Sequence, residues 1–449
     1  MRLNLVSTVA LALALATASS TASAQVRTPT SDASAPQALS PAQRDAVIAA
    51  IGTAFRTSYV YPEKVPAIIT RLDRARKAGR YTVTNPNELA GLITGDLREA
   101  SHDRHAFLEY DPARFAATSA VPAGAPAQDL ADFDTGVARR DHYGLTEQRI
   151  LAGNVRYLKI AGFEWVSDET GKAYDDAMRF LKGGDAVIID LRGNGGGSSE
   201  AVQYLVSHFL KAGTLEITFL AAGHDPVQTR VLDTLPAGRM VGKPLYVLVD
   251  QGSASAAESF AYDVQQFKLG QLVGATTAGA ANNNAFMPIA PGFMLSVSMG
   301  RPVHPVSKTN WEGTGVAPDV VAVPVQALDQ AHLLALQALQ AKPASAEIAG
   351  DYAWALPEIE ARLHPVGLPA ASVTAPGTYG KYVVTRETAG LLIARPGHPL
   401  WPAPRRLTPL NGDGLFAVDG IDILRVAIKP DTLELWWKGE GTPRVLKRG

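Results

Sequence analysis

Short apolar segments alternate with helix-like segments between about residues 130 and 335, and this alternation limits the possible folds most strongly. The segments "AVIID" (186–190) and "YVLVD" (246–250) are almost entirely apolar, which is typical of strands buried on both faces. Amphipathic stretches such as "DETGKAYDDAMRFLKG" (168–183) lie between such strands and predict helices. Strands that alternate with helices in this way indicate a parallel α/β layer.

The sequence on either side of this layer has a different pattern. Apolar residues at helical spacing predict a small N-terminal helical domain over residues 40–110. Residues 114–128 are rich in Ala, Pro and Ser and indicate a flexible connection to a core at 130–335. Further helix-like sequence followed by strand-like segments with tight turns predicts a helix and a small antiparallel β-domain within residues 345–449.

The first 24 residues have the pattern of a secretory signal peptide. Arg2 precedes an apolar stretch that ends in the A-x-A pattern of Ala22 to Ala24, after which we expect cleavage. The apolar stretch is too short and too rich in Ala, Ser and Thr to span a membrane well. We therefore expect an exported protein, periplasmic or secreted, with a polar linker at residues 25–39.

Composition excludes several classes of chemistry. The chain of 449 residues has no cysteine, which excludes disulfides, thiol catalysis and cysteine-ligated metals. Its formal net charge is -1 and it has no basic block, so nothing in it favours nucleic-acid binding. We expect no nucleic-acid partner and no stable membrane insertion, while the oligomeric state stays open.

Two strands of the predicted layer end in small residues that could surround a ligand. The first leads into "LRGNGGG" (191–197) and the second into "QGSAS" (251–255). Ligands of open α/β sheets bind outside the carboxyl ends of the strands, where consecutive glycine N–H groups can hold a negative oxygen. A nucleotide loop fits less well, because G-K-S/T is missing and Ser198 interrupts G-x-G-x-x-G. The plain alternatives are a flexible glycine turn and a helix cap at Ser253 or Ser255.

Five motifs in this order resemble those of the tail-specific, or C-terminal processing, serine peptidase family. They are "SHDRHAFLEY" (101–110), "DLRGNGGG" (190–197), "GSASAAE" (252–258), "VGATTAGAA" (273–281) and "WEGTGVAPDVV" (311–321). The match in order and spacing covers about residues 150–325, with the first motif extending it upstream. The resemblance implies a crotonase-like (ClpP/crotonase) α/β core, a serine peptidase acting on peptide or protein substrates, and no cofactor.

The resemblance also assigns roles to individual residues. Ser255 is the second serine of the family's S-A-S-A-[SA]-E pattern and matches the nucleophile, on which an acyl-enzyme would form. Backbone N–H groups would form an oxyanion hole, and the residues that match are Gly195, Gly196 and Gly197 with Ala256, the residue after the nucleophile.

Two departures from the best-known branch of this family indicate a different branch. That branch has a lysine base in T-[FY]-G-K-G, but here the matching residues run from Thr277 to Ala280 without a lysine. There is also no room for a clear PDZ domain before the core. The chain is instead similar to the tricorn protease core and to the repeats of interphotoreceptor retinoid-binding protein. In tricorn-like enzymes a histidine from before the core is the base, and a glutamate near G-V-x-P-D supports it.

His105 and Glu312 match these two roles. A histidine can take the proton of a serine hydroxyl near neutral pH, and a carboxylate orients the ring and stabilises its charged form. His102 is an alternative base, and Asp103 could orient either ring. Two histidines three residues apart also suggest a metal site, but neither H-E-x-x-H nor a third obvious ligand accompanies them, so we expect no metal.

A different class of function remains as an alternative. The retinoid-binding repeats resemble the same fold and bind apolar ligands, so the chain could be a non-catalytic protein that binds an apolar ligand or a peptide. A binding protein has no need of a serine, a histidine and a glutamate at catalytic positions. The joint presence of Ser255, His105 and Glu312 therefore favours the peptidase.

Overall fold

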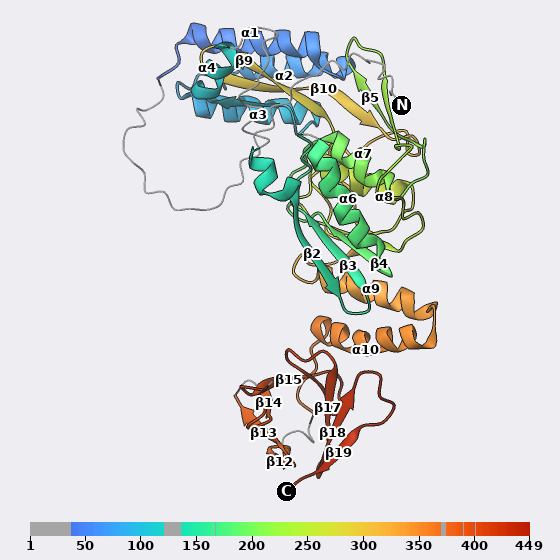
Figure 1. Cartoon of the computed structure of the whole chain (residues 1–449). Coiled ribbons are helices and arrows are strands. Elements are labelled where there is room, and N and C mark those ends of the chain that lie inside the picture. Colours follow the sequence, from blue (N-terminus) through green and yellow to red (C-terminus); the bar gives the residue numbers. More distant parts are fainter. Residues whose placement is uncertain (1–36, 121–135, 167, 370–373, 389, 400) are drawn as a thin grey trace.

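The computed structural model describes most of the chain in three sheets with helices packed between and around them. The described residues are 37–120, 136–166, 168–369, 374–388, 390–399 and 401–449. The chain passes from N-terminal helices, through an α/β core and two further helices, to a β-domain at the opposite end (Figure 1). The predicted signal peptide and most of the linker at 25–39 lie outside the described residues.

The central layer is a six-stranded sheet with the order β11-β8-β7-β4-β3-β2. Its strands are β2 (Leu145–Leu151), β3 (Val155–Ile160), β4 (Ala186–Asp190), β7 (Leu245–Val249), β8 (Gln271–Gly274) and β11 (Val320–Val321). All neighbours are parallel except β2, which pairs antiparallel with β3 at one edge. Every residue of β4 and β7 is buried. The predicted crotonase-like α/β core is confirmed.

Helices cover both faces of this sheet, which explains the apolar strand sequences. The helices α6 (Asp168–Lys182), α7 (Ser199–Ser207) and α8 (Ala256–Gln266) pack against one face. The helices α9 (Ala327–Ala341) and α10 (Ala346–Leu363) pack against the other. Successive strand residues therefore enter two different cores, because side chains along a strand point to alternate faces.

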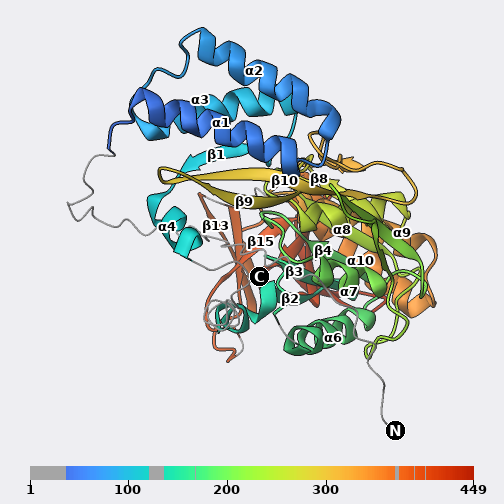
Figure 2. The ribbon, with the colours of Figure 1, turned by 90° about the horizontal axis from the view of Figure 1, so that it is seen from above.

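A second sheet lies beneath the N-terminal helices α1 (Pro41–Ser58), α2 (Val65–Lys77) and α3 (Pro86–Ser101), as Figure 2 shows. Its order is β1-β10-β5-β6, and β9 also pairs with β10. The strands are β1 (Phe107–Tyr110), β5 (Leu215–Ala221), β6 (Val227–Arg230), β9 (Asn283–Ile289) and β10 (Phe293–Val303). The β9–β10 hairpin belongs to this sheet, and its residues Phe293, Leu295 and Val297 are buried against the helices.

Residues 112–120 form a helix, α4 (Pro112–Ala120), where the sequence predicted part of a flexible connection. Pro112 begins this helix, and the Asp111 carboxylate accepts the N–H of Arg114 at 2.9 Å. Proline is favoured in the first turn and the alanines that follow have high helix propensity, so local signals here favoured a helix. The rest of the predicted connection, from residue 121, lies outside the described residues.

The C-terminal region is a closed meander of eight strands in chain order, which confirms the predicted antiparallel β-domain. The strands are β12 (Gly377–Tyr379), β13 (Tyr382–Glu387), β14 (Gly390–Ala394), β15 (Arg405–Pro409), β16 (Leu415–Val418), β17 (Leu424–Ile428), β18 (Thr432–Trp437) and β19 (Arg444–Lys447). A bridge between Tyr379 and Arg448 closes the meander into a small barrel with an apolar interior. Trp354 of α10 contacts it, donating from Nε1 to the Asp422 carbonyl at 2.8 Å.

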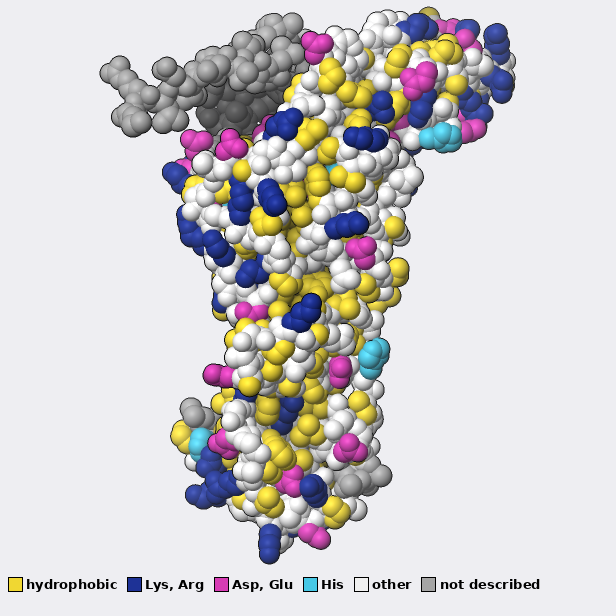
Figure 3. Space-filling view, turned by 90° about the vertical axis from the view of Figure 1, so that its right-hand side faces the viewer, with side chains coloured by type: hydrophobic (Ala, Val, Ile, Leu, Met, Phe, Trp, Pro, Cys, Tyr) yellow, Lys and Arg dark blue, Asp and Glu magenta, His cyan; other side chains and the backbone are white. Residues whose placement is uncertain are grey.

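Two further properties of the described residues concern membrane-spanning character and the distribution of charge. Within the described residues, no helix combines the length and apolar character that crossing a membrane requires. On the face shown in Figure 3, lysine and arginine side chains are interspersed with acidic ones over the whole length of the molecule.

Candidate active site

The glycine loop after β4 and the serine turn after β7 meet at the carboxyl edge of the central sheet. Gly196 lies against Ser255. A Cβ atom added to Gly196 would lie 2.6 Å from the Ser255 Cβ and 2.9 Å from the Ala254 carbonyl oxygen. There is thus no space for a side chain, and the φ angle of +107° is one that residues other than glycine rarely adopt. Only glycine fits this position.

Ser255 has an unusual backbone conformation at the turn between β7 and α8. Its φ and ψ angles are 53° and -117°, although it is not a glycine. A residue held in so sparsely populated a region is strained, and such residues cluster at functional sites. The turn places Ser255 directly before the first residue of α8, where the helix dipole favours negative charge.

Ser253 has a different environment from Ser255. It is fully buried, and its hydroxyl donates to the Leu191 carbonyl at 2.7 Å and accepts the N–H of Asp250 at 3.1 Å. These bonds join the ends of β4 and β7. Ser253 therefore holds the two strand ends together, and its hydroxyl is already engaged.

The glycine loop supplies backbone N–H groups, but one of the predicted donors is engaged. The N–H of Gly196 donates to the Asn194 side chain at 2.8 Å, and the Asn194 amide donates to the Ile160 carbonyl at 2.9 Å. Within the described part of the chain, the N–H groups of Gly195, Gly197 and Ala256 have no hydrogen-bond partner. These three groups are the donors available to a developing oxyanion in this conformation.

Glu258, the last residue of the motif at 252–258, is a buried carboxylate for which the sequence predicted no role. It accepts the N–H groups of Ser255 at 3.0 Å, Gly279 at 2.6 Å and Ala280 at 2.8 Å, and the hydroxyl of Thr277. It thus fixes the Ser255 turn against the loop at 277–280. The spacing of Ser255 and Glu258 matches the S-x-x-E capping box, and this signal could have indicated the bond to Ser255.

Glu312 holds the next part of the same loop. Its Oε2 atom accepts the N–H groups of Ala281 at 2.7 Å and Asn282 at 2.8 Å, and its Oε1 atom accepts that of Arg104 at 3.3 Å. Four consecutive N–H groups, 279–282, are thus divided between two buried carboxylates. Burial alone would favour the neutral acid, but His105 and the two loop N–H groups outweigh it and lower the pKa of Glu312.

His105 lies beside Glu312. Its Nδ1 atom is 3.7 Å from the Glu312 Oε2 atom, which is longer than a hydrogen bond, and it is buried without another partner. Asp103 accepts the backbone N–H of His105 at 2.9 Å and the Tyr59 hydroxyl at 3.1 Å, so it positions the His105 backbone. His102 is exposed and occupies the left-handed C-cap of α3, with a φ angle of 54°.

Asp103, His105 and Glu312 also form a cluster of metal-ligand size. Each offers one ligand atom, and these atoms lie within 4.8 Å of one another. Both carboxylates, however, already accept hydrogen bonds from protein donors. This arrangement fits a carboxylate that stabilises an imidazole, and we propose no metal here.

Comparison with known proteins identifies the core. Residues 154–322 match the family model of Peptidase family S41. The α/β core of this chain resembles Peptidase family S41 over these residues. The predicted resemblance to tail-specific serine peptidases is confirmed.

Two curated relatives of this S41 core are carboxy-terminal processing proteases of Bacillus subtilis (strain 168). CtpB is 26% identical over 178 residues, which cover 39% of this chain and 35% of CtpB. CtpA is 32% identical over 130 residues, which cover 28% of this chain and 26% of CtpA. The match thus spans about a third of the length of these relatives. A solved structure, "Crystal Structure of mature CPAF", is 12% identical with a TM-score of 0.47, and covers 66% of this chain and 98% of that chain.

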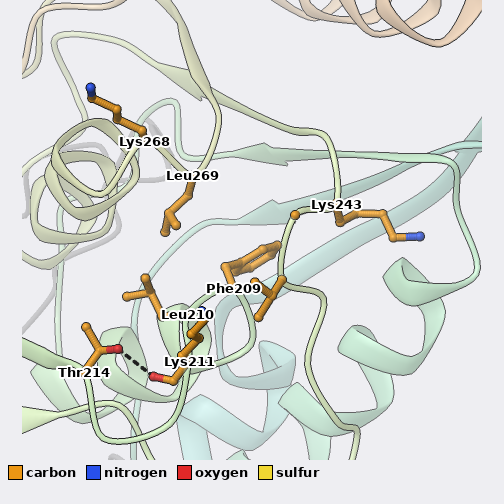
Figure 4. A pocket seen from close by; sticks show the side chains of 9 residues that line it. Phe209, Leu210, Lys211, Thr214, Lys243, Lys268 and Leu269 are labelled. Carbon is orange, nitrogen blue, oxygen red and sulfur yellow. Dashed lines mark hydrogen bonds between the residues drawn. The ribbon is translucent and has the colours of Figure 1, made fainter. Parts of the chain in front are cut away.

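A pocket of about 320 Å³ lies away from these S41 motifs, near the amino ends of β7 and β8. Phe209, Leu210 and Leu269 line it with apolar side chains (Figure 4). Of the lysines at its margin, Lys243 extends away from the pocket, and its ammonium donates to the carbonyls of Lys182 and Gly184.

Proposed function

We propose that the chain is an exported serine peptidase that cleaves peptide bonds through an acyl-enzyme on Ser255. The observation that carries this proposal is the strained φ angle of Ser255 against the backbone of Gly196. A sharp strand-to-helix turn of this kind is how nucleophile elbows present a serine hydroxyl. The S41 match of residues 154–322 supports the same reaction class.

The proposed reaction needs a nucleophile, a base and oxyanion donors, and we assign these roles to Ser255, His105 and the loop N–H groups. His105 takes the proton of Ser255 as the hydroxyl oxygen attacks the scissile carbonyl carbon. The resulting oxyanion accepts hydrogen bonds from the N–H groups of Ala256 and of Gly195 or Gly197. The N–H of Gly196 can donate to it only after its hydrogen bond to the Asn194 side chain breaks. The C–N bond then breaks, and His105 returns the proton to the leaving amine. A water deprotonated by His105 finally hydrolyses the ester and regenerates the Ser255 hydroxyl.

Glu312 stabilises the charged form of His105 during these steps. The present separation of 3.7 Å between His105 Nδ1 and Glu312 Oε2 is loose, and hydrogen bonds at catalytic sites commonly tighten only when substrate binds.

Other features of the sequence support the branch and the location that we propose. Position 280 is alanine and not lysine, which supports the histidine-dependent, tricorn-like branch. The pattern of residues 1–24 supports export to the periplasm or the exterior. The domains we propose are residues 40–110, 130–335 and 345–449.

Covalent labelling tests the nucleophile. We expect a fluorophosphonate to label wild-type protein and Ser253→Ala, because an activated serine reacts and a bonded structural serine does not. Ser255→Ala should lose labelling and reduce casein hydrolysis by several orders of magnitude, with an unchanged melting temperature. Ser253→Ala should instead lower stability by about 1–3 kcal/mol, because buried partners lose their hydrogen bonds.

Two results would contradict this assignment. Labelling of Ser255→Ala that equals the wild type, together with loss in Ser253→Ala, would move the nucleophile to Ser253. A folded wild-type protein that neither labels nor hydrolyses casein would favour the non-catalytic binding protein.

A further inference from the structure

The strand β9 has an outer edge that no other strand covers in the described residues. It pairs only with β10, which lies between β9 and β1 over the first part of its length. Native proteins usually protect such an edge with charged side chains or proline, because unpaired backbone groups attract other strands. The sequence of β9, "NNAFMPI", contains no charged residue, and its one proline is near the far end.

The register shows which backbone groups face outward. The carbonyl of Gly292 accepts the N–H of Asp111, so even-numbered residues of this part of β10 face β1 and odd-numbered ones face β9. Their partners in β9 are residues 285, 287 and 289. The groups of Asn284, Phe286 and Pro288 therefore point away from β10. Pro288 agrees with this assignment, because it has no N–H to give to the ladder.

This open edge begins beside the candidate catalytic residues. Asn282, which immediately precedes β9, donates its N–H to Glu312, the carboxylate next to His105. The Asn284 side chain donates to the Ser296 hydroxyl at 2.6 Å, and that hydroxyl donates to the His105 carbonyl. The outward groups nearest the site are those of Asn284 and Phe286, while Pro288 removes a donor at the far end.

Phe286 gives this edge a side-chain surface as well. Its ring contacts the ring of Phe107 at a centroid distance of 5.7 Å, and the guanidinium of Arg114 lies 3.7 Å from its centroid. Both phenylalanines are only partly buried. A strand added to β9 would therefore gain main-chain hydrogen bonds and an apolar contact next to the site.

We propose that the outer edge of β9 binds the substrate as an added strand, through main-chain hydrogen bonds to Asn284 and Phe286. This inference rests on the proposed function and deepens it, because it names the substrate class. Substrates are extended or unfolded segments recognised mainly through their backbone. A folded helix or a segment with proline at the paired positions does not fit this edge.

Proline scanning at one position tests the backbone contact. The probe is fluorescein-labelled β-casein, and its dissociation constant is measured by anisotropy in a Ser255→Ala background, so that no turnover occurs. Phe286→Pro removes an outward N–H without removing a bond to β10, whereas Phe286→Ala removes the ring and keeps the N–H. We expect Phe286→Pro to weaken casein binding at least tenfold more than Phe286→Ala, with melting temperatures that confirm folding. Equal dissociation constants for the two variants would overturn the inference.

A second measurement leaves the protein unchanged. A fluorescein-labelled decapeptide is compared with two versions that carry N-methyl groups at its odd or its even residues. One version should bind at least tenfold more weakly than the other, because only alternate N–H groups of an added strand face β9. Equal binding of the two versions would overturn the inference. Failure of the proposed function is distinguishable, because wild-type protein would then resist fluorophosphonate while both binding differences persist.

Discussion

Glu312 is buried and accepts backbone N–H groups, and these contacts determine whether its carboxylate is charged near neutral pH. Its lowered pKa keeps the carboxylate ionised throughout the neutral range. A negative charge beside an imidazole stabilises the charged ring that forms when a histidine base takes a proton. The pair His105–Glu312 can therefore be tested by removing one member at a time.

We expect Glu312→Gln to lower kcat, because the ring of His105 loses the charge that would stabilise its protonated form during the reaction. His105→Ala should remove nearly all activity, because the serine hydroxyl loses its base. The measurement is kcat and kcat/KM for the wild type, these two variants and His102→Ala.

His102→Ala is the matched control, because His102 is exposed at a helix end three residues away. Full activity in His105→Ala would exclude His105 as the base. The same experiment would then assign the role to His102 if His102→Ala were inactive.

Sequence motifs indicate single residues more readily than their hydrogen bonds. Ser255 and Glu312 are predicted catalytic residues because a family pattern marks their positions, and these roles stay predictions. The role of Glu258 was missed, because its partners Gly279 and Ala280 are about twenty residues away and meet it only through the fold. The engagement of Gly196 by Asn194 was equally invisible, because a glycine loop in a sequence does not show where its N–H groups point.

At the scale of elements, the glycine loop is fixed by a short bridge to the segment after β3. Phe163 donates its N–H to the Gly196 carbonyl at 2.8 Å, and its own carbonyl accepts the N–H of Ser198 at 2.7 Å. A Cβ atom on Gly197 would lie 1.9 Å from the Phe163 carbonyl oxygen, whereas one on Gly195 would meet nothing within 4 Å. Position 195 therefore has space for a side chain, whereas position 197 does not.

We expect Gly197→Ala to break the Phe163 bridge, reducing kcat at least tenfold and destabilising the loop by several kcal/mol, since its φ angle is +132°. Gly195→Ala should keep the loop conformation and most of the activity. Steady-state kinetics and thermal unfolding of both variants check this expectation. A Gly197→Ala protein with wild-type kinetics would show that the bridge does not position the oxyanion donors.

Elements with a clear sequence pattern were predicted well, but the sheet to which the β9–β10 hairpin belongs was not. The strands β4 and β7 followed directly from their apolar runs. The place of the β9–β10 hairpin did not, because alternation shows that one face is buried without showing which element buries it. The helix α4 was missed because the Ala and Ser content of residues 114–120 was interpreted as flexible, although Pro112 and Asp111 begin a helix well.

At the scale of the whole molecule, buried neutral histidines make stability depend on pH. Burial lowers the pKa of His208 to about 4 and that of His304 to about 4, and it also lowers the pKa of His332. These residues belong to different parts of the fold. A lowered pKa means that the stabilising contribution is complete above the unfolded value of about 6.5 and is lost as pH falls toward 4.

We expect the free energy of unfolding to decrease between pH 7.5 and pH 5, with His208 contributing about 2 kcal/mol. His208→Asn should reduce this decrease, because the variant has no imidazole to protonate at that position. His224→Asn is the control, since His224 is exposed. Denaturant unfolding at both pH values measures the difference within each protein, and an equal decrease in wild type and His208→Asn would refute the contribution of His208.

The backbone anchoring of the loop at 279–282 separates its shape from its side chains. Glu258 and Glu312 hold it through backbone N–H groups, so its path does not depend on the side chain at position 280. A different side chain at this position could therefore change the chemistry available beside the Ser255 turn while the backbone around it keeps its path.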